Sequence, residues 1–103
     1  MRMLMKVSVP VEAGNATIKD GSLVRNLQSI LADLEPEAAY FTADNGVRTG
    51  FIVVNIDDPS QLPAVAEPFF LAFNARVEFI PAMTAEDLGK AGPAIEDAVK
   101  KYG

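Results

Sequence analysis

Residues 37–56 read EAAYFTADNGVRTGFIVVNI, and this stretch decides the fold. At its centre, Asp44-Asn45-Gly46 predicts a tight hairpin turn, because an Asn-Gly pair accepts the positive φ angles that such a turn requires. Residues 37–44 and 47–56 are then two antiparallel strands. The run Phe51-Ile52-Val53-Val54 is apolar on both faces, which is typical of a central strand that is covered on both sides.

Two further strands are expected outside this hairpin. Residues 2–10 alternate between apolar and polar side chains, and Pro10 closes the pattern. Residues 75–82 are the expected fourth strand. On the apolar face of the first strand lie Met3, Met5, Val7 and Val9.

The segments between the strands predict crossover helices. Residues 14–34 carry leucine and isoleucine at helical spacing, and Gly21-Ser22 leaves open whether this helix starts late or bends there. Residues 58–73 begin with Asp58 as the cap and Pro59 in the first turn. With right-handed crossovers, this order of elements gives a four-stranded antiparallel sheet with both helices on one face.

A last helix is expected after the fourth strand. Thr84 is its predicted cap, and acidic residues follow in the first turn. Gly92-Pro93 interrupts the apolar stripe of this helix, so we expect a kink there. Because 103 residues leave room for one core, residues 1–103 are predicted to form a single α+β domain.

The composition favours a homodimer. Half of the residues are hydrophobic and the mean hydropathy is +0.17. A domain of this size buries only about two thirds of its unfolded surface, so many apolar side chains are left facing water. A self-complementary two-fold contact between two copies is the commonest way to cover such a surface.

The absence of certain residue types excludes several kinds of chemistry. The chain has no cysteine and no histidine, which removes thiolate catalysis, the usual general base and the usual zinc and haem ligands. A net charge of −5, with scattered basic residues, argues against binding of nucleic acid. No segment is apolar for long enough to be a signal peptide or a membrane span. We therefore expect a cytoplasmic protein with no metal, no cofactor and no nucleic-acid or membrane partner.

A resemblance to a known family rests on four segments: Asp57-Asp58-Pro59-Ser60, Glu67-Pro68-Phe69-Phe70, Asn74-Ala75 and Pro81-Ala82-Met83-Thr84-Ala85-Glu86-Asp87-Leu88. In them the chain resembles a small bacterial family of ferredoxin-like domains without an assigned function, and the βαββαβ order with an added C-terminal helix is similar to the dimeric α+β barrel superfamily over the whole chain. The resemblance implies that the sheet pairs face to face with that of a second copy. Haem enzymes of that superfamily use a histidine ligand, which this chain lacks.

The sheet face away from the helices is expected to carry most of the polar candidates. Lys6 and Glu78 fall on neighbouring strands there, and the favoured interpretation is a cross-strand ion pair that tunes the dimer contact. The alternative is that both groups converge on a small anionic ligand. Tyr40 is a candidate hydrogen-bond donor, and Asn55 is the better candidate because a buried amide needs partners that a ligand can supply. The side chains predicted on this face are Leu4, Lys6, Ser8, Tyr40, Thr42, Phe51, Val53, Asn55, Arg76, Glu78 and Ile80.

Glu67-Pro68-Phe69-Phe70 is the second candidate region. Pro68 lies inside the second crossover helix and leaves the carbonyl of Ala64 without its amide partner. A kink there would open a gap between helix and sheet, lined by Phe70 and its neighbouring phenylalanines, with Glu67 at the rim. The favoured alternative is that these phenylalanines belong to the core. Glu67 is the carboxylate to test first as a general base.

These observations favour a dimeric module that binds a small organic ligand or serves in interactions, without a recognisable catalytic motif. No nucleophile lies beside a base in the sequence. The alternative, which the superfamily resemblance implies, is a cofactor-independent enzyme of the oxygenase or isomerase type that acts on a small organic acid or aromatic compound. The ligand-binding candidates are Lys6, Tyr40, Asn55, Glu67, Phe70 and Glu78, with Glu67 as the weak catalytic candidate.

Overall fold

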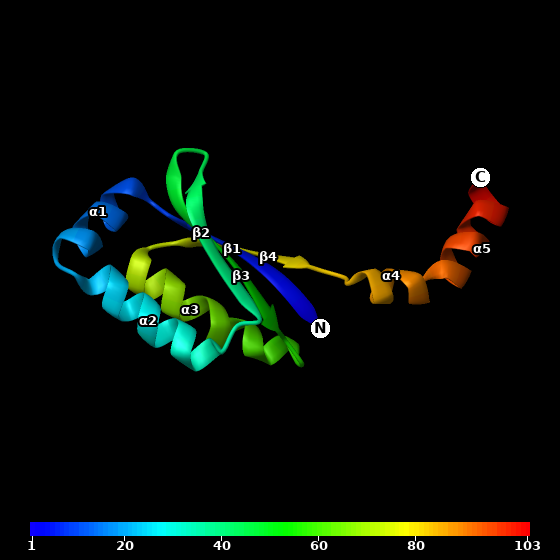
Figure 1. Ribbon diagram of the computed structural model, residues 1–103, viewed down its shortest axis with the longest axis horizontal. Helices are drawn as coiled ribbons and strands as arrows, with labels where there is room; N and C mark the ends of the chain where they lie inside the picture. The colour runs from blue at the N-terminus through cyan, green and yellow to red at the C-terminus, as the bar shows by residue number, and fades with distance from the viewer.

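A four-stranded antiparallel sheet forms the centre of the computed structural model, which describes residues 1–103 (Figure 1). The strands lie in the order β2-β3-β1-β4, as in ferredoxin-like folds. The predicted α+β class and all four predicted strands are confirmed. Their bounds are β1 (Arg2–Val9), β2 (Ala38–Asp44), β3 (Val47–Asn55) and β4 (Arg76–Pro81).

The hairpin between β2 and β3 forms where the sequence predicts it. Asn45 has a φ of 52° and Gly46 a φ of 77°, so both residues of the turn adopt the left-handed conformation. β3 pairs with β2 along one edge and with β1 along the other. The expected central position of β3 is confirmed, and β1 is the second central strand.

Three helices cover one face of the sheet: α1 (Val11–Lys19), α2 (Ser22–Leu34) and α3 (Leu62–Phe73) (Figure 1). The sequence left open whether the first crossover helix starts late or bends at Gly21-Ser22. The chain forms two helices there, α1 and α2, which break at Gly21, whose φ is 79°. A short 3₁₀ turn, η1 (Pro59–Gln61), precedes α3. No helix of the chain combines the length and the hydrophobicity that a membrane crossing demands.

The predicted cap of the second crossover is confirmed. The Asp58 carboxylate accepts a hydrogen bond of 2.9 Å from the backbone N–H of Ser60. In return, the Gln61 side chain accepts one of 3.0 Å from the backbone N–H of Asp58. These reciprocal bonds satisfy amide donors that the start of a helix leaves free.

The core lies between the three helices and the sheet. Its most deeply buried side chains are Met5 of β1, Ile52 of β3 and Phe69 of α3, which are at most 1% exposed. All four apolar residues predicted for the inner face of β1 are buried. The opposite face of the sheet has no helix over it, and we call it the open face (Figure 1).

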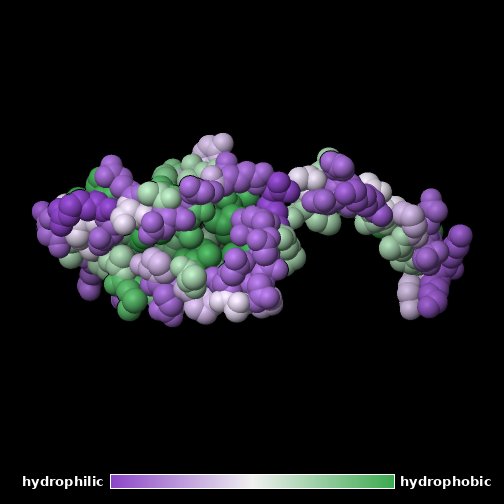
Figure 2. All heavy atoms as spheres, turned by 90° about the horizontal axis from the view of Figure 1, so that it is seen from below, coloured by the Kyte–Doolittle hydropathy of each residue, from purple (hydrophilic) through white to green (hydrophobic).

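Residues 82–103 leave this body as an extended arm that contains α4 (Ala85–Lys90) and α5 (Gly92–Tyr102). The kink expected at Gly92-Pro93 is present as the break between the two helices. No residue of either helix is buried, and the molecule measures 58 × 28 × 20 Å. Figure 2 shows the arm as a separate lobe that a narrow neck joins to the body.

The core position of Phe69 leads to a stability prediction. Phe69→Ala should lower the free energy of unfolding by about 3–5 kcal/mol, because it removes a fully buried ring. Leu71→Ala in the same helix is the matched control and should change it by less than about 0.5 kcal/mol, since Leu71 is 83% exposed. Urea unfolding followed by circular dichroism measures both, and equal losses would contradict this description of α3.

Candidate functional site

The open face carries apolar and charged side chains together. The register places Lys6 of β1 between Phe51 of β3 and Glu78 of β4, and Phe51 lies opposite Tyr40 of β2. These residues share one face because cross-strand partners point the same way and side chains alternate along each strand. The set of side chains predicted for this face is therefore confirmed.

Lys6 forms its ion pair with Asp44. The Nζ atom of Lys6 lies 2.7 Å from Oδ2 of Asp44, and their side chains are 24% and 34% exposed. Glu78 lies instead 3.6 Å from Arg76. The expected pair between Lys6 and Glu78 does not form, because the long lysine side chain reaches along the face to the hairpin end and Glu78 has a nearer cation on its own strand.

The contact with Asp44 also affects the ionisation of Lys6. The hydrogen bond from Lys6 to the Asp44 carboxylate raises the pKa of the lysine above its ordinary value. Lys6 is therefore charged at neutral pH and acts as a hydrogen-bond donor. It cannot serve as a general base there.

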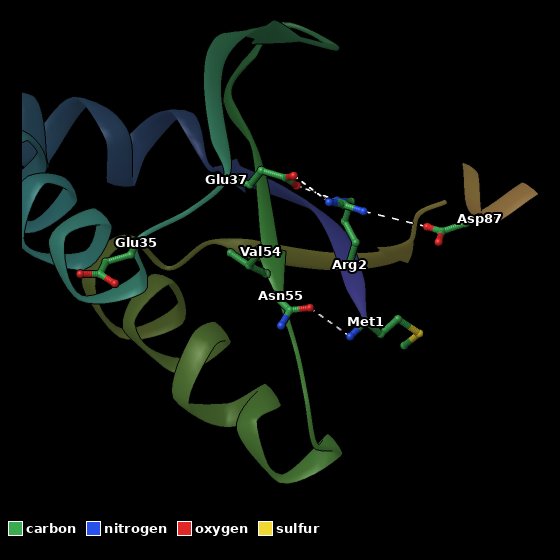
Figure 3. A pocket seen from close by; sticks show the side chains of 7 residues that line it. All are labelled: Met1, Arg2, Glu35, Glu37, Val54, Asn55 and Asp87. Atoms are coloured by element: carbon green, nitrogen blue, oxygen red, sulfur yellow. Dashed lines mark hydrogen bonds and ion pairs between the residues drawn. The ribbon is translucent and has the colours of Figure 1, made fainter. Parts of the chain in front are cut away.

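A second candidate site is a pocket of about 510 Å³ at the end of the sheet where β1 begins and β3 ends (Figure 3). Only two of its seven lining residues are hydrophobic. Asn55 is the only residue from the predicted candidate set that lines it. The lining residues are Met1, Arg2, Glu35, Glu37, Val54, Asn55 and Asp87.

Arg2 is the centre of this pocket. Its Nε and Nη2 atoms donate hydrogen bonds of 2.6 and 2.7 Å to the two carboxylate oxygens of Glu37. Its Nη1 atom lies 4.0 Å from Asp87 at the start of α4 (Figure 3). This two-point contact raises the pKa of Arg2 and lowers the pKa of Glu37. Arg2 thereby joins the start of β2 and the base of the arm to β1.

The Asn55 amide finds its partners within the chain. Its Oδ1 atom accepts a hydrogen bond of 3.0 Å from the Met1 amino group, and its Nδ2 atom donates one of 2.8 Å to Asp57. The Asn55 side chain is exposed, whereas the prediction chose it as a buried amide in need of partners. The cation and both amide atoms of this pocket are therefore already bonded within the chain, which argues for a structural role.

Sequence reasoning missed Arg2, Glu37 and Asp87 as a cluster. Arg2 lies on the polar side of the first strand's alternation, and Asp87 is one of the acids noted in the first turn of the last helix. Neither pattern says that these residues meet, because their approach depends on the strand register and on the path of the arm. The place of Arg2 on the polar side of the alternating first strand was the only sequence signal that could have pointed to this cluster.

The gap at Pro68, the less favoured of the two interpretations, does not form. Phe69 and Phe73 are 1% and 3% exposed and belong to the core, which is the favoured alternative, whereas Phe70 is 40% exposed. The cavity beside the two buried rings has only about 40 Å³, far below the volume of about 300 Å³ at which ligand pockets begin. Glu67 is exposed and does not line this cavity, and Pro68 lines a groove between α2 and α3.

The chain belongs to a family described as "Domain of unknown function (DUF3303)", which matches residues 1–96. No curated protein matches the chain. The match extends beyond the sheet through α4 and into α5. Most of the arm is thus part of the family's domain.

The Arg2–Glu37 pair predicts a specific response to acid. Because the pKa of Glu37 is lowered in the folded state, the pair stabilises the fold fully above the ordinary value of 4.5 and ceases to do so as the pH falls through the lowered pKa. Glu37→Gln should therefore make the loss of stability between roughly pH 5 and pH 2 less steep. Urea unfolding at a series of pH values measures this slope.

Arg2→Gln is a complementary variant, because it removes the cationic partner of the same ion pair. It should flatten the acid response by a similar amount, and the double variant should add little to either single change. A wild-type slope in Glu37→Gln would show that the pair does not contribute to acid stability.

Proposed function

We propose that the chain works as a homodimeric module that binds a small organic ligand between the open faces of two copies. The observation that supports this is the uncovered apolar surface of the open face. Tyr40 is 72% exposed and Ile80 46% exposed, and Leu4 and Phe51 are partly exposed beside them. Apolar residues gathered on one face of a small domain mark a contact surface.

The ferredoxin-like strand order supports a face-to-face arrangement. With the helices on one side of the sheet, only the open face is free to pack against another sheet, at a spacing of about 10 Å. The resulting assembly is a dimeric α+β barrel. Its interior is lined by the open faces of both copies.

The chemistry of the open face supports a small organic ligand with an aromatic or flat part and a polar group. Phe51 and Tyr40 offer ring surfaces, and the Lys6 ammonium group keeps two N–H donors besides the one directed at Asp44. A few polar groups in a largely apolar cavity are what small-molecule sites have in common. A cofactor-independent enzyme would use the same cavity, but no observation favours it, since Glu67 lies on α3 and outside the open face.

The first test is native mass spectrometry of the full chain after gentle purification. We expect the mass of a dimer with a retained small molecule. A monomer at micromolar concentration would overturn the proposal, and a dimer without any adduct would favour an interaction module over a binding module.

A substitution on the open face tests how the dimer forms. Ile80→Glu should convert the dimer to a monomer, because it would bury an unpaired carboxylate in the contact. Val24→Glu, at a 56% exposed position on α2, adds the same charge on the helix side and should leave the dimer intact. Size-exclusion chromatography with light scattering measures both, and a dimer that survives Ile80→Glu would argue against face-to-face pairing.

A substitution at Lys6 tests the ligand contact separately from the dimer. Lys6→Met keeps the length of the side chain but removes the donor, so the retained adduct should be lost while the dimer remains. Native mass spectrometry reports both outcomes in one spectrum. An adduct that is retained in Lys6→Met would exclude Lys6 from the ligand site.

A further inference from the structure

The arm has an apolar stripe with nothing packed against it. Ile95 is 50% exposed, Val99 63% and Tyr102 84%, and they recur at helical spacing along α5. Leu88 adds to the stripe from α4 at 51% exposure. The arm contacts its own body mainly at its base (Figure 1). There Asp87 approaches Arg2 (Figure 3).

These two helices are too short to be stable alone. α4 has 6 residues and α5 has 11, and isolated helices shorter than about 12–15 residues are marginal in water. The start of α4 is capped, since Thr84 accepts a hydrogen bond of 3.1 Å from the N–H of Asp87, whereas α5 has no side-chain cap. Caps alone do not replace the packing of an apolar face, which supplies most helical stability. The arm therefore needs a surface to pack on.

The dimensions of the chain show how much surface is left uncovered. The chain exposes 6959 Å², whereas a compact monomer of 11.0 kDa exposes about 5,600 Å². The excess of roughly 1,300 Å² exceeds the ~800 Å² that each partner of a standard interface buries. The radius of gyration is 17.2 Å, against about 13 Å for a compact domain of this length. The uncovered area is enough for a stable dimer.

The base of the arm directs it away from its own sheet. The N–H of Ala82 donates a hydrogen bond of 3.1 Å to the Arg2 carbonyl, which continues the β1–β4 pairing up to the start of the arm. Only Met83 and Thr84 then separate Ala82 from α4. The connection is short and Asp87 lies near Arg2. The arm therefore continues beyond the C-terminal end of β4 and does not fold back over its own sheet (Figure 1).

We infer that the arms are exchanged, so that the apolar stripe of each arm packs on the β2 edge of a second copy. Placing the arm there rests on the face-to-face pairing proposed above. When the two-fold axis of such a pair runs along the strands, the β4 edge of one copy, from which the arm leaves, meets the β2 edge of the other. At that edge Tyr40 and Phe41 are exposed by 72% and 54%, one on each face of the strand.

The charges of the arm are compatible with a second copy as its partner. The chain as a whole carries a net charge of −5, which opposes self-association. The arm itself is nearly balanced, because its four carboxylates are accompanied by three lysines. Lys100 and Lys101 lie in the last turn of α5. The arm therefore adds little of the repulsion between two acidic chains.

Photo-cross-linking of the full chain tests the exchange directly. The cross-linker p-benzoylphenylalanine is placed at position 95, in the stripe, and in a matched control at position 100, on the polar side of the same helix. Irradiation of the position-95 protein should give a covalent dimer on a denaturing gel, with the cross-link mapped by mass spectrometry to residues 38–44 of the other chain. The position-100 protein should give little or none.

The outcomes separate this inference from the proposed function. A cross-link from position 95 to the same chain, or no cross-link in a protein that is dimeric by native mass spectrometry, overturns the exchange and leaves face-to-face pairing in place. A cross-link to another surface of the second chain overturns the assignment to the β2 edge. A monomeric protein overturns both proposals.

A substitution in the stripe provides an independent measurement. Val99→Asp should weaken dimerisation at least about tenfold, because it places a charge in the apolar contact. Lys100→Gln is the control, since it makes the same change in net charge on the polar side and should alter the dimerisation constant less than about threefold. Equal constants for the two variants, measured by analytical ultracentrifugation, would overturn the exchange.

Discussion

The pairing of β1 with strands on both edges is the constraint on which the rest of the structure depends. β1 lies between β3 and β4, so its alternation defines the two faces of the whole sheet. Its inward residues, such as Met5 at 0% and Val7 at 3% exposure, form the floor of the core. A shift of the register by one residue would move these side chains to the open face and bring Lys6 under the helices. The core and the open face are therefore fixed by the same hydrogen bonds.

This arrangement covers one side of the sheet and leaves the other without cover. The three helices pack only on the inward side chains of the sheet. The apolar side chains of the open face therefore have no helix packed against them. The apolar stripe of the arm is also uncovered, since α4 and α5 bury no residue. In the proposed dimer, a second copy would supply a large complementary contact to both surfaces at once.

The local features of the fold could be predicted from the sequence, whereas the contacts between distant segments could not. The Asn45-Gly46 turn, the Asp58 cap and the break near Gly92 each depend on a few neighbouring residues, and each was found where expected. The partner of Lys6 depends on the reach of a long side chain along the face, and the Arg2–Glu37 pair depends on register. The detachment of the arm could not be predicted, because an amphipathic helix has the same pattern whether it packs on its own body or on another chain. The choice of Asn55 as a ligand-binding candidate assumed that its side chain is buried. The alternation of side chains along a strand gives the face on which a residue lies but not its burial.

The pairing of charges on the open face bears on how two acidic chains can associate. Its cations Arg2, Lys6 and Arg76 lie 2.6, 2.7 and 3.6 Å from a carboxylate, so the face holds charged groups but little net charge. The chain's surplus of negative charge must then lie mainly on the helix side and at the chain's periphery, which would point away from a second copy in a face-to-face pair. At physiological ionic strength, charges separated by more than about 8 Å are largely screened. Repulsion between the two chains would then be weak where their apolar surfaces meet, and the apolar contact would determine whether they associate.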